Sequence, residues 1–209
     1  MMCRLTSILA ILATLVWLTG CLGKTRFPAY YTLHVPATVD VPSPAAVRPS
    51  LAVREFGSPA YLREGAIVYR TSPVEVGFYQ YHRWAVDPRE FLTNTIIDRL
   101  RATGQFGDVR NYDGRSDVDY FFSGRLEKLE EVDYEGGVRV EVALSAQITD
   151  LRAGKTVWAG AASETARVEN RNVPAVVAKM SQATDRAIRK LLASLNLPTT
   201  SSLNSSLQK

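Results

Sequence analysis

Hydrophobic and polar residues alternate with a period of two along much of the second half of the chain. The clearest run extends from Val138 to Thr149, where valine, leucine, alanine and isoleucine alternate with charged, amide and hydroxyl side chains. Such alternation is typical of a half-buried antiparallel strand. Similar runs predict strands at 118–126 and 155–168, and Gly136-Gly137 and Ala153-Gly154 predict hairpin turns between the three strands.

Shorter apolar or aromatic segments in the first half also predict strands. They cover residues 30–35, 51–56, 66–70, 76–84 and 106–109. Several prolines between residues 36 and 49 indicate that the first two segments are joined by an irregular loop.

Two segments carry apolar residues at helical spacing. Asp87 is a suitable N-cap, Pro88 follows it in the first turn, and Gly104 can adopt the left-handed conformation that ends a helix. A second helix is expected to begin at Asn172 or Val173 and to run to about Leu195. The apolar face of the first helix contains Phe91, Leu92, Ile96, Ile97 and Leu100, and that of the second contains Val177, Met180, Thr184, Ile188, Leu191 and Leu195.

These elements predict an α+β fold in a single domain over residues 30–195. Because hairpins dominate the second half, we expect a mostly antiparallel or mixed sheet, with the two amphipathic helices packed on one face of it. The polar residues 196–209 have low complexity and are expected to form a disordered tail.

The first twenty residues have the features of a secretory signal. Arg4 supplies a positive charge, an apolar run extends from Leu5 to Leu18, and small residues follow it. As a helix, about 14 residues would cover roughly 21 Å, whereas a bilayer core needs about 30 Å. Residues 1–20 are therefore predicted to be cleaved rather than to remain as a membrane span.

Leu18-Thr19-Gly20-Cys21 resembles the lipobox of bacterial lipoproteins, in which the cysteine thiol accepts diacylglycerol before cleavage. Cys3 leaves with the signal, so Cys21 becomes the single cysteine of the mature chain and no internal disulfide can form. The expected covalent groups are diacylglycerol and an N-acyl chain such as palmitate on Cys21, with no other cofactor. Residues 21–29 would then be a short lipidated tether.

The compartment follows from the residue after the lipobox and from the charge. In lipoproteins of this kind, aspartate after the cysteine favours the inner membrane, whereas this chain has Leu22, which favours the outer membrane with the body facing the periplasm. The formal net charge of +4 comes without a long basic run, which argues against nucleic acid as a partner.

No catalytic or metal-binding pattern stands out in the sequence, so the chain is not expected to be an enzyme. His34 and His82 do not have zinc-ligand spacing, and Asp117 and Asp119 are interpreted as edge or solvent residues. The acidic cluster Glu130, Glu131, Asp133 and Glu135 is predicted to be a solvated hairpin tip, with a cation site or partner contact as the alternative.

The aromatic segment 78–84 is the main surface candidate. Strict alternation would place Phe78, Gln80, His82 and Trp84 on one face, and Tyr79, Tyr81 and Arg83 on the other. One face is expected to join the core. The other, with Tyr79, Tyr81 and Arg83, is either structural or an aromatic contact for a partner.

A series of short motifs occurs in a fixed order in the first half of the chain. They are Tyr31-Thr32-Leu33, Ile67-Val68-Tyr69-Arg70, Tyr79 to Tyr81, Arg83-Trp84-Ala85, Pro88, Leu92, Leu100 and Gly104-x-Phe106-x-x-Val109. With the lipobox, this series resembles the ABC-type transport auxiliary lipoprotein family, which includes the lipoprotein of the paraquat-inducible Pqi system. The resemblance covers most of residues 30–195 and is strongest over 61–109.

The resemblance implies an accessory protein without catalytic residues, working beside an MCE-domain protein and an ABC transporter or related permease. Its role would be lipid trafficking or envelope integrity, through protein contact. MCE assemblies are ring-like, so a homo-oligomer is compatible with this role. The alternatives are an envelope scaffold or outer-membrane assembly lipoprotein without an MCE partner, and a periplasmic hydrolase, for which two separated histidines are poor material.

Overall fold

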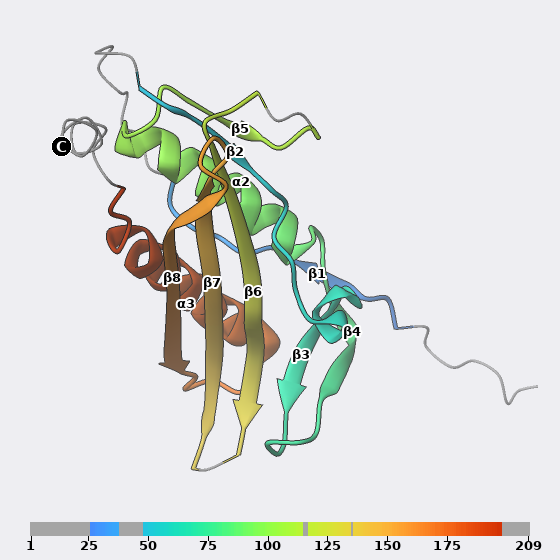
Figure 1. The fold of residues 1–209 in the computed structure, drawn as a ribbon. Coiled ribbons are helices and arrows are strands. Elements are labelled where there is room, and N and C mark those ends of the chain that lie inside the picture. The colour runs from blue at the N-terminus through green and yellow to red at the C-terminus, as the bar shows by residue number, and fades with distance from the viewer. Residues whose placement is uncertain (1–25, 38–47, 115–116, 135, 198–209) are drawn as a thin grey trace, which may run out of the picture.

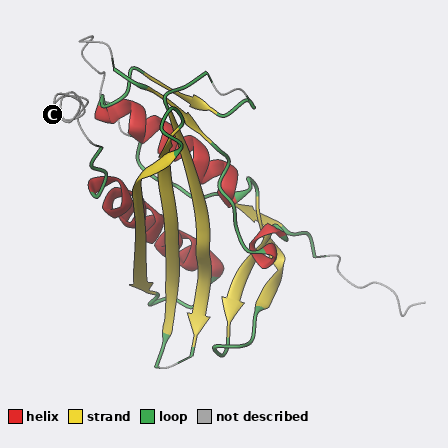
Figure 2. Cartoon of the chain, in the orientation of Figure 1, coloured by secondary structure: helices red, strands yellow, loops and turns green. Residues whose placement is uncertain are grey.

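The computed structural model describes residues 26–37, 48–114, 117–134 and 136–197. These residues form one open mixed sheet of eight strands, and two long helices lie behind it in the view of Figures 1 and 2. The predicted α+β class, with both helices on one face of a mixed sheet, is confirmed. The predicted signal peptide and lipobox lie outside the described residues, as do residues 198–209 of the predicted tail. The tail was expected to begin at residue 196, but Leu197 still packs against the core.

The elements follow the order expected from the periodicity, with shifted ends. They are β1 (Ala29–Tyr31), β2 (Ser50–Val53), the 3-10 helix η1 (Ala60–Arg63), β3 (Ala66–Arg70), β4 (Gly77–Trp84), α2 (Pro88–Thr103), β5 (Asp108–Asn111), β6 (Tyr120–Asp133), β7 (Val138–Asp150), β8 (Lys155–Arg167) and α3 (Val173–Ala193). Strand β1 is shorter than expected, β6 extends seven residues beyond Leu126, and η1 had no counterpart in the predictions.

Strand β6 is the centre of the sheet. On one side it pairs along its whole length with β7, and β7 pairs with β8, both in antiparallel register. On the other side its first residues pair in parallel with β2, and its last residues pair in parallel with β3. A register shift between Leu126 and Lys128 lets Glu127 bulge out, so the side chains that follow change face.

The capping residues expected from the sequence are found at the ends of both helices. The Asp87 carboxylate accepts a hydrogen bond from the Arg89 amide at the start of α2, and Gly104 is left-handed at its end, with φ 63°. Asn172 caps α3 by accepting from the Ala175 amide at 2.9 Å. An ion pair between Arg99 of α2 and Asp185 of α3 joins the two helices directly.

The core lies between the sheet and the helices. On this side of the sheet, Phe56, Phe122 and Trp158 lie close together, with ring centroids 6.1 and 6.2 Å apart for successive pairs. Phe56 is 1% exposed, and its ring covers the Cα of Gly124, where a Cβ would lie only 2.3 Å from the ring. The absence of a side chain at Gly124 is therefore what allows the Phe56 ring to reach the sheet.

Candidate docking surface

The face of the sheet turned away from the helices is open over β6, β7 and β8. Register pairs such as Arg125 with Ser145, and Ser145 with Ala161, place these side chains together on that face. We call it the open face. It includes Ser123, Arg125, Lys128, Glu130, Arg139, Glu141, Ser145, Gln147, Ala159 and Ala161.

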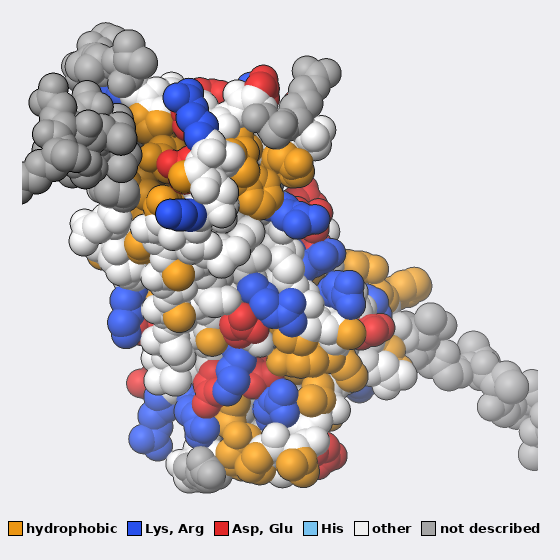
Figure 3. Space-filling model, in the orientation of Figure 1, with side chains coloured by type: hydrophobic (Ala, Val, Ile, Leu, Met, Phe, Trp, Pro, Cys, Tyr) orange, Lys and Arg blue, Asp and Glu red, His pale blue; other side chains and the backbone are white. Residues whose placement is uncertain are grey.

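The upper half of the open face is hollowed and weakly polar. Small side chains leave an open depression of about 600 Å³ across the three strands. Its lining is Ser123, Gly124, Arg125, Ser145, Ala146, Gln147, Ala159, Gly160 and Ala161. Figure 3 shows this region as a largely uncharged band above a cluster of charges.

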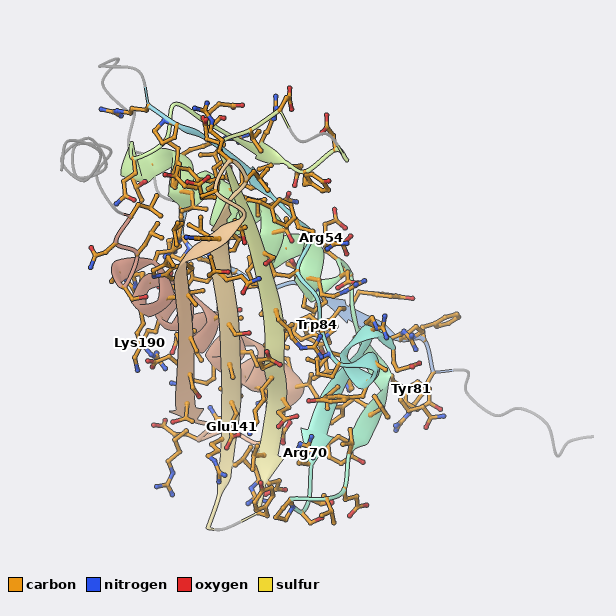
Figure 4. All side chains as sticks on the ribbon, viewed as in Figure 1. Arg54, Arg70, Tyr81, Trp84, Glu141 and Lys190 are labelled. Carbon is orange, nitrogen blue, oxygen red and sulfur yellow. The ribbon has the colours of Figure 1, made fainter. Side chains whose placement is uncertain are left out.

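The lower half of the open face is an ion network. The Arg70 Nε lies 2.9 Å from a carboxylate oxygen of Glu130, and Glu141 is paired with Lys128 at 2.9 Å and with Arg139 at 3.0 Å. Glu130 and Glu141 are opposite one another in register. Three cations thus share two carboxylates, and the labelled Arg70 and Glu141 in Figure 4 mark the two sides of the network.

The two carboxylates of the network are held in charged surroundings. Burial works against ionisation of Glu141, but Lys128 and Arg139 outweigh it and hold the pKa of this carboxyl below its usual range. Glu130 is only 1% exposed and also accepts a hydrogen bond from the Tyr61 hydroxyl at 3.3 Å. Burial and the nearby charge of Glu130 raise the pKa of Tyr61.

The prediction of a solvated acidic hairpin tip was wrong for two of its residues. Glu130 and Glu131 are 1% and 6% exposed, because β6 continues to Asp133 between two neighbouring strands. The carboxylates occupy opposite faces of this strand, where Arg70 and Tyr61 cover one and Tyr79 covers the other. Asp133 is exposed, and Glu135 lies outside the described residues.

Glu131 has a tyrosine as its hydrogen-bond partner. The Tyr79 hydroxyl donates to the Glu131 carboxylate at 2.8 Å. Burial raises the pKa of Glu131, against the effect of this hydrogen bond, and burial together with the carboxylate raises the pKa of Tyr79. Tyr79 is therefore already engaged with β6 and packed against the core.

Glu131→Gln is expected to change the pH dependence of stability. The pKa of Glu131 is higher in the folded protein than in the unfolded chain, where a glutamate has its ordinary pKa of 4.5. Its stabilising contribution is therefore fully present below pH 4.5 and is lost as the pH rises through the folded pKa. The variant should therefore gain stability relative to wild type between pH 4.5 and 7, measured by urea unfolding. Exposed Glu169→Gln is the matched control; a variant that loses relative stability over this window would contradict the assignment.

Strict alternation along the aromatic strand was also wrong. Ala66 pairs with Arg83 and Val68 pairs with Phe78, so one residue of β3 lies opposite four of β4. This large bulge breaks the alternation, so that some side chains of β4 lie on the face opposite to the expected one. Tyr79 and His82, expected on opposite faces, have ring centroids 5.6 Å apart.

The other two candidate contact residues have different surroundings. Arg83 donates to the Glu64 carbonyl at 2.7 Å. It also lines an open depression together with Tyr61, Glu64, Ala66 and Phe78. Phe78 and Arg83 therefore share a face, although alternation placed them on opposite faces. The guanidinium of Arg26 lies 5.9 Å from the ring centroid of Tyr81. Tyr79, Tyr81 and Arg83 thus do not form one patch, because Tyr79 turns towards Glu131.

The side chains of His82, Asp117 and Asp119 have structural partners, and His34 is bonded through its backbone amide. The His82 ring is hydrogen bonded to the Tyr31 hydroxyl at 3.0 Å, and the His34 amide donates to Ser181. Asp117 forms an ion pair with Arg110. Asp119 accepts hydrogen bonds from the amide and the hydroxyl of Ser50, and these bonds hold the pKa of Asp119 below its usual range. Across the described ranges, no three metal-ligating side chains cluster, and no helix is long and apolar enough to cross a bilayer.

The geometry of the described residues offers a broad surface on the open face. A flat sheet face with a smooth hollow beside ordered charges suits contact with another macromolecule. The periodicity indicated which side chains of β7 share this face. The ion network was missed because Arg70 and Glu130 are distant in sequence, and no local signal connects them.

Comparisons with solved structures show the same fold. Protein XCC0632 from Xanthomonas campestris has a TM-score of 0.66 and 17% identity, with 86% of this chain and 100% of that chain covered. An uncharacterized protein has a TM-score of 0.63 and 17% identity, over 81% of this chain and 99% of its own.

No curated protein matches the chain. A family model does, over residues 31–191, and its description is ABC-type transport auxiliary lipoprotein component. The match includes every strand from the last residue of β1 onward and nearly all of α3. The chain therefore belongs to the ABC-type transport auxiliary lipoprotein family.

Proposed function

We propose that this protein is anchored to the outer membrane through lipid on Cys21 and acts as the accessory of an ABC-type system that moves lipids between the envelope membranes. Its partner is an MCE-domain protein that reaches it from the inner membrane. The observation that carries the proposal is the family match over residues 31–191. The lipobox sequence at 18–21 supplies the anchor.

The open face supports a role in protein contact. Both helices cover the other side of the sheet, so among the described residues β6, β7 and β8 present a broad surface that no further element covers (Figure 1). The ion network orders the long side chains of Arg70, Lys128 and Arg139 before a partner arrives. Less side-chain entropy then remains to be lost on binding.

Cys21→Ser, secreted behind a signal peptide that is cleaved without lipidation, should move the protein from the membrane to the soluble periplasmic fraction. Each lipid CH₂ buried in a bilayer contributes about 0.8 kcal/mol of anchoring, so losing the acyl chains removes nearly all membrane affinity. The body should stay folded, with an unchanged circular dichroism spectrum and melting temperature, since no disulfide is lost. Mass spectrometry of the N-terminal peptide measures the lipid directly.

Capture of the lipidated protein from solubilised membranes should recover an MCE-domain protein together with an ABC transporter or permease subunit. A photo-reactive residue in place of Gln147, on the open face, should cross-link to the MCE protein, whereas one in place of Glu169 should not. Recovery of a β-barrel assembly machine without an MCE protein would instead favour the scaffold role. A membrane-bound Cys21→Ser protein would contradict the anchoring proposal.

A further inference from the structure

Exposed apolar side chains gather at the edge of the sheet where the chain enters the fold. Among the described residues, seven large apolar side chains are exposed, and four of them belong to β1, β4 or their flanking residues: Phe27, Tyr30, Phe78 and Val86. Phe27 is 83% and Tyr30 is 62% exposed. Single exposed apolar residues are ordinary, but a cluster of them marks a contact surface.

Arg83 connects Tyr30 and Phe78 of this group on one surface. Tyr30 of β1 pairs with Arg83 of β4, and Arg83 lines the same depression as Phe78. Arg26 lies over the ring of Tyr81. We call Arg26, Phe27, Tyr30, Phe78, Tyr81 and Arg83 the N-terminal edge patch. Figure 4 labels Tyr81 of this patch, and Figure 3 shows apolar and basic atoms beside the start of the described chain.

The patch combines aromatic rings with positive charge. Arg26 and Arg83 lie within it, and Arg63 and Glu64 are adjacent at the end of η1. Glu64 is the acidic side chain that lines the depression beside Arg83. Tyrosine and phenylalanine suit the boundary between headgroups and acyl chains, and arginine binds phosphate through several N–H donors.

The length of the tether limits how far this patch can move from the anchor. Five residue steps separate Cys21 from Arg26, which span at most about 18 Å when fully extended. That distance is shorter than the thickness of one hydrocarbon core. If Cys21 carries lipid, the patch is the part of the described body that is held nearest to the bilayer.

We propose that the N-terminal edge patch lies on the phospholipid surface that holds the Cys21 anchor. Phe27, Tyr30 and Phe78 enter the headgroup region, and Arg26 and Arg83 bind lipid phosphates. This inference depends on the lipid anchor of the proposed function. The contact fixes the orientation of the sheet relative to the membrane, so that the body does not swing freely on its tether.

The test uses lipidated protein reconstituted in vesicles of phosphatidylethanolamine and phosphatidylglycerol. Since the sulfur of Cys21 is bonded to lipid, Tyr30→Cys provides a single free thiol for an environment-sensitive fluorophore. The label at position 30 should show a blue-shifted emission and several-fold weaker quenching by aqueous iodide. The matched control is Leu151→Cys, an exposed position in the turn between β7 and β8, which should remain fully quenchable.

A charge reversal tests the role of arginine. Arg26→Glu in the Tyr30→Cys protein should restore much of the iodide quenching, whereas Lys155→Glu, the same change on exposed β8, should not. Equal quenching at positions 30 and 151 in protein of verified lipid mass would overturn the bilayer contact and leave the anchor intact. If the label at position 30 is shielded from iodide only after an MCE-domain protein is added, the bilayer contact is overturned in favour of a protein interface. An N-terminus without lipid would overturn both proposals.

Discussion

Arg70→Met is expected to destabilise the fold by about 3 kcal/mol, which corresponds to a fall in melting temperature of roughly 6–12 °C for a domain of this size. Arg70 is the cation paired directly with Glu130, whose side chain is 1% exposed. Methionine keeps the apolar stem that covers this part of the sheet but removes the charge. Among the described residues, the Tyr61 hydroxyl would then be the remaining hydrogen-bond donor to the buried Glu130 carboxyl.

The double variant Arg70→Met with Glu130→Met separates the ion pair from packing. Removing both charges should recover most of the lost stability, because replacing a whole buried pair by apolar groups is often nearly neutral. Tyr61→Phe should cost only about 1 kcal/mol, as is usual for one hydrogen bond. If urea unfolding finds the double variant as unstable as Arg70→Met, the buried charge is not the cause.

Gly124→Val is expected to cost at least about 2 kcal/mol, within the range typical of overpacked cores. A Cβ at this position would lie 2.3 Å from the Phe56 ring. Phe56 is 1% exposed and packed against Phe122, so the ring has no free space to enter. The substitution must therefore displace the ring or push β6 away from it.

Gly57→Ala is the control for the glycine substitution. A Cβ at Gly57 would lie 3.5 Å from the end of the flexible Arg125 side chain, which is ordinary contact. The control should unfold within about 0.5 kcal/mol of wild type in urea, as is usual for surface substitutions. Gly124→Val combined with Phe56→Ala should lose less stability than the two single changes together. Additive losses would show that Gly124 and Phe56 do not compete for the same space.

Both helices could be located from the sequence because their signals are local. Asp87, Pro88 and Gly104 mark the ends of α2 within a few residues of its apolar stripe, and Asn172 does the same at the start of α3. Strand β7 was equally clear, since its alternation is unbroken from Val138. In such segments, local preference and tertiary packing favour the same structure.

Strand β6 was underestimated because its periodicity changes in the middle. Up to Leu126 the apolar residues occupy every second position, and after the bulge at Glu127 the buried positions begin again at Leu129. A break in period is typical of a strand end, so Glu130 and Glu131 were assigned to a turn. Nothing near them in sequence indicates that Arg70 and Tyr79 are their partners.

The candidate contact residues of β4 illustrate the same limit. Alternation alone cannot place a bulge, because a bulge is determined by how β3 and β4 pair. Tyr81 and Arg83 remain on an accessible surface, but Tyr30 of β1, which joins them there, is about fifty residues away in the sequence. The N-terminal edge patch exists only once the sheet has formed.

The pairing of β6 on its two sides also determines the order in which the protein can assemble. Its hairpin with β7, the hairpin of β7 with β8, and the packing of α3 join segments that are neighbours along the chain. Its parallel partners β2 and β3 come from about seventy and about sixty residues earlier, and loop closure over such lengths slows folding. During synthesis, the N-terminal half must therefore wait for residues 120–133 to emerge, and a chaperone that holds it unfolded until then would protect it from aggregation.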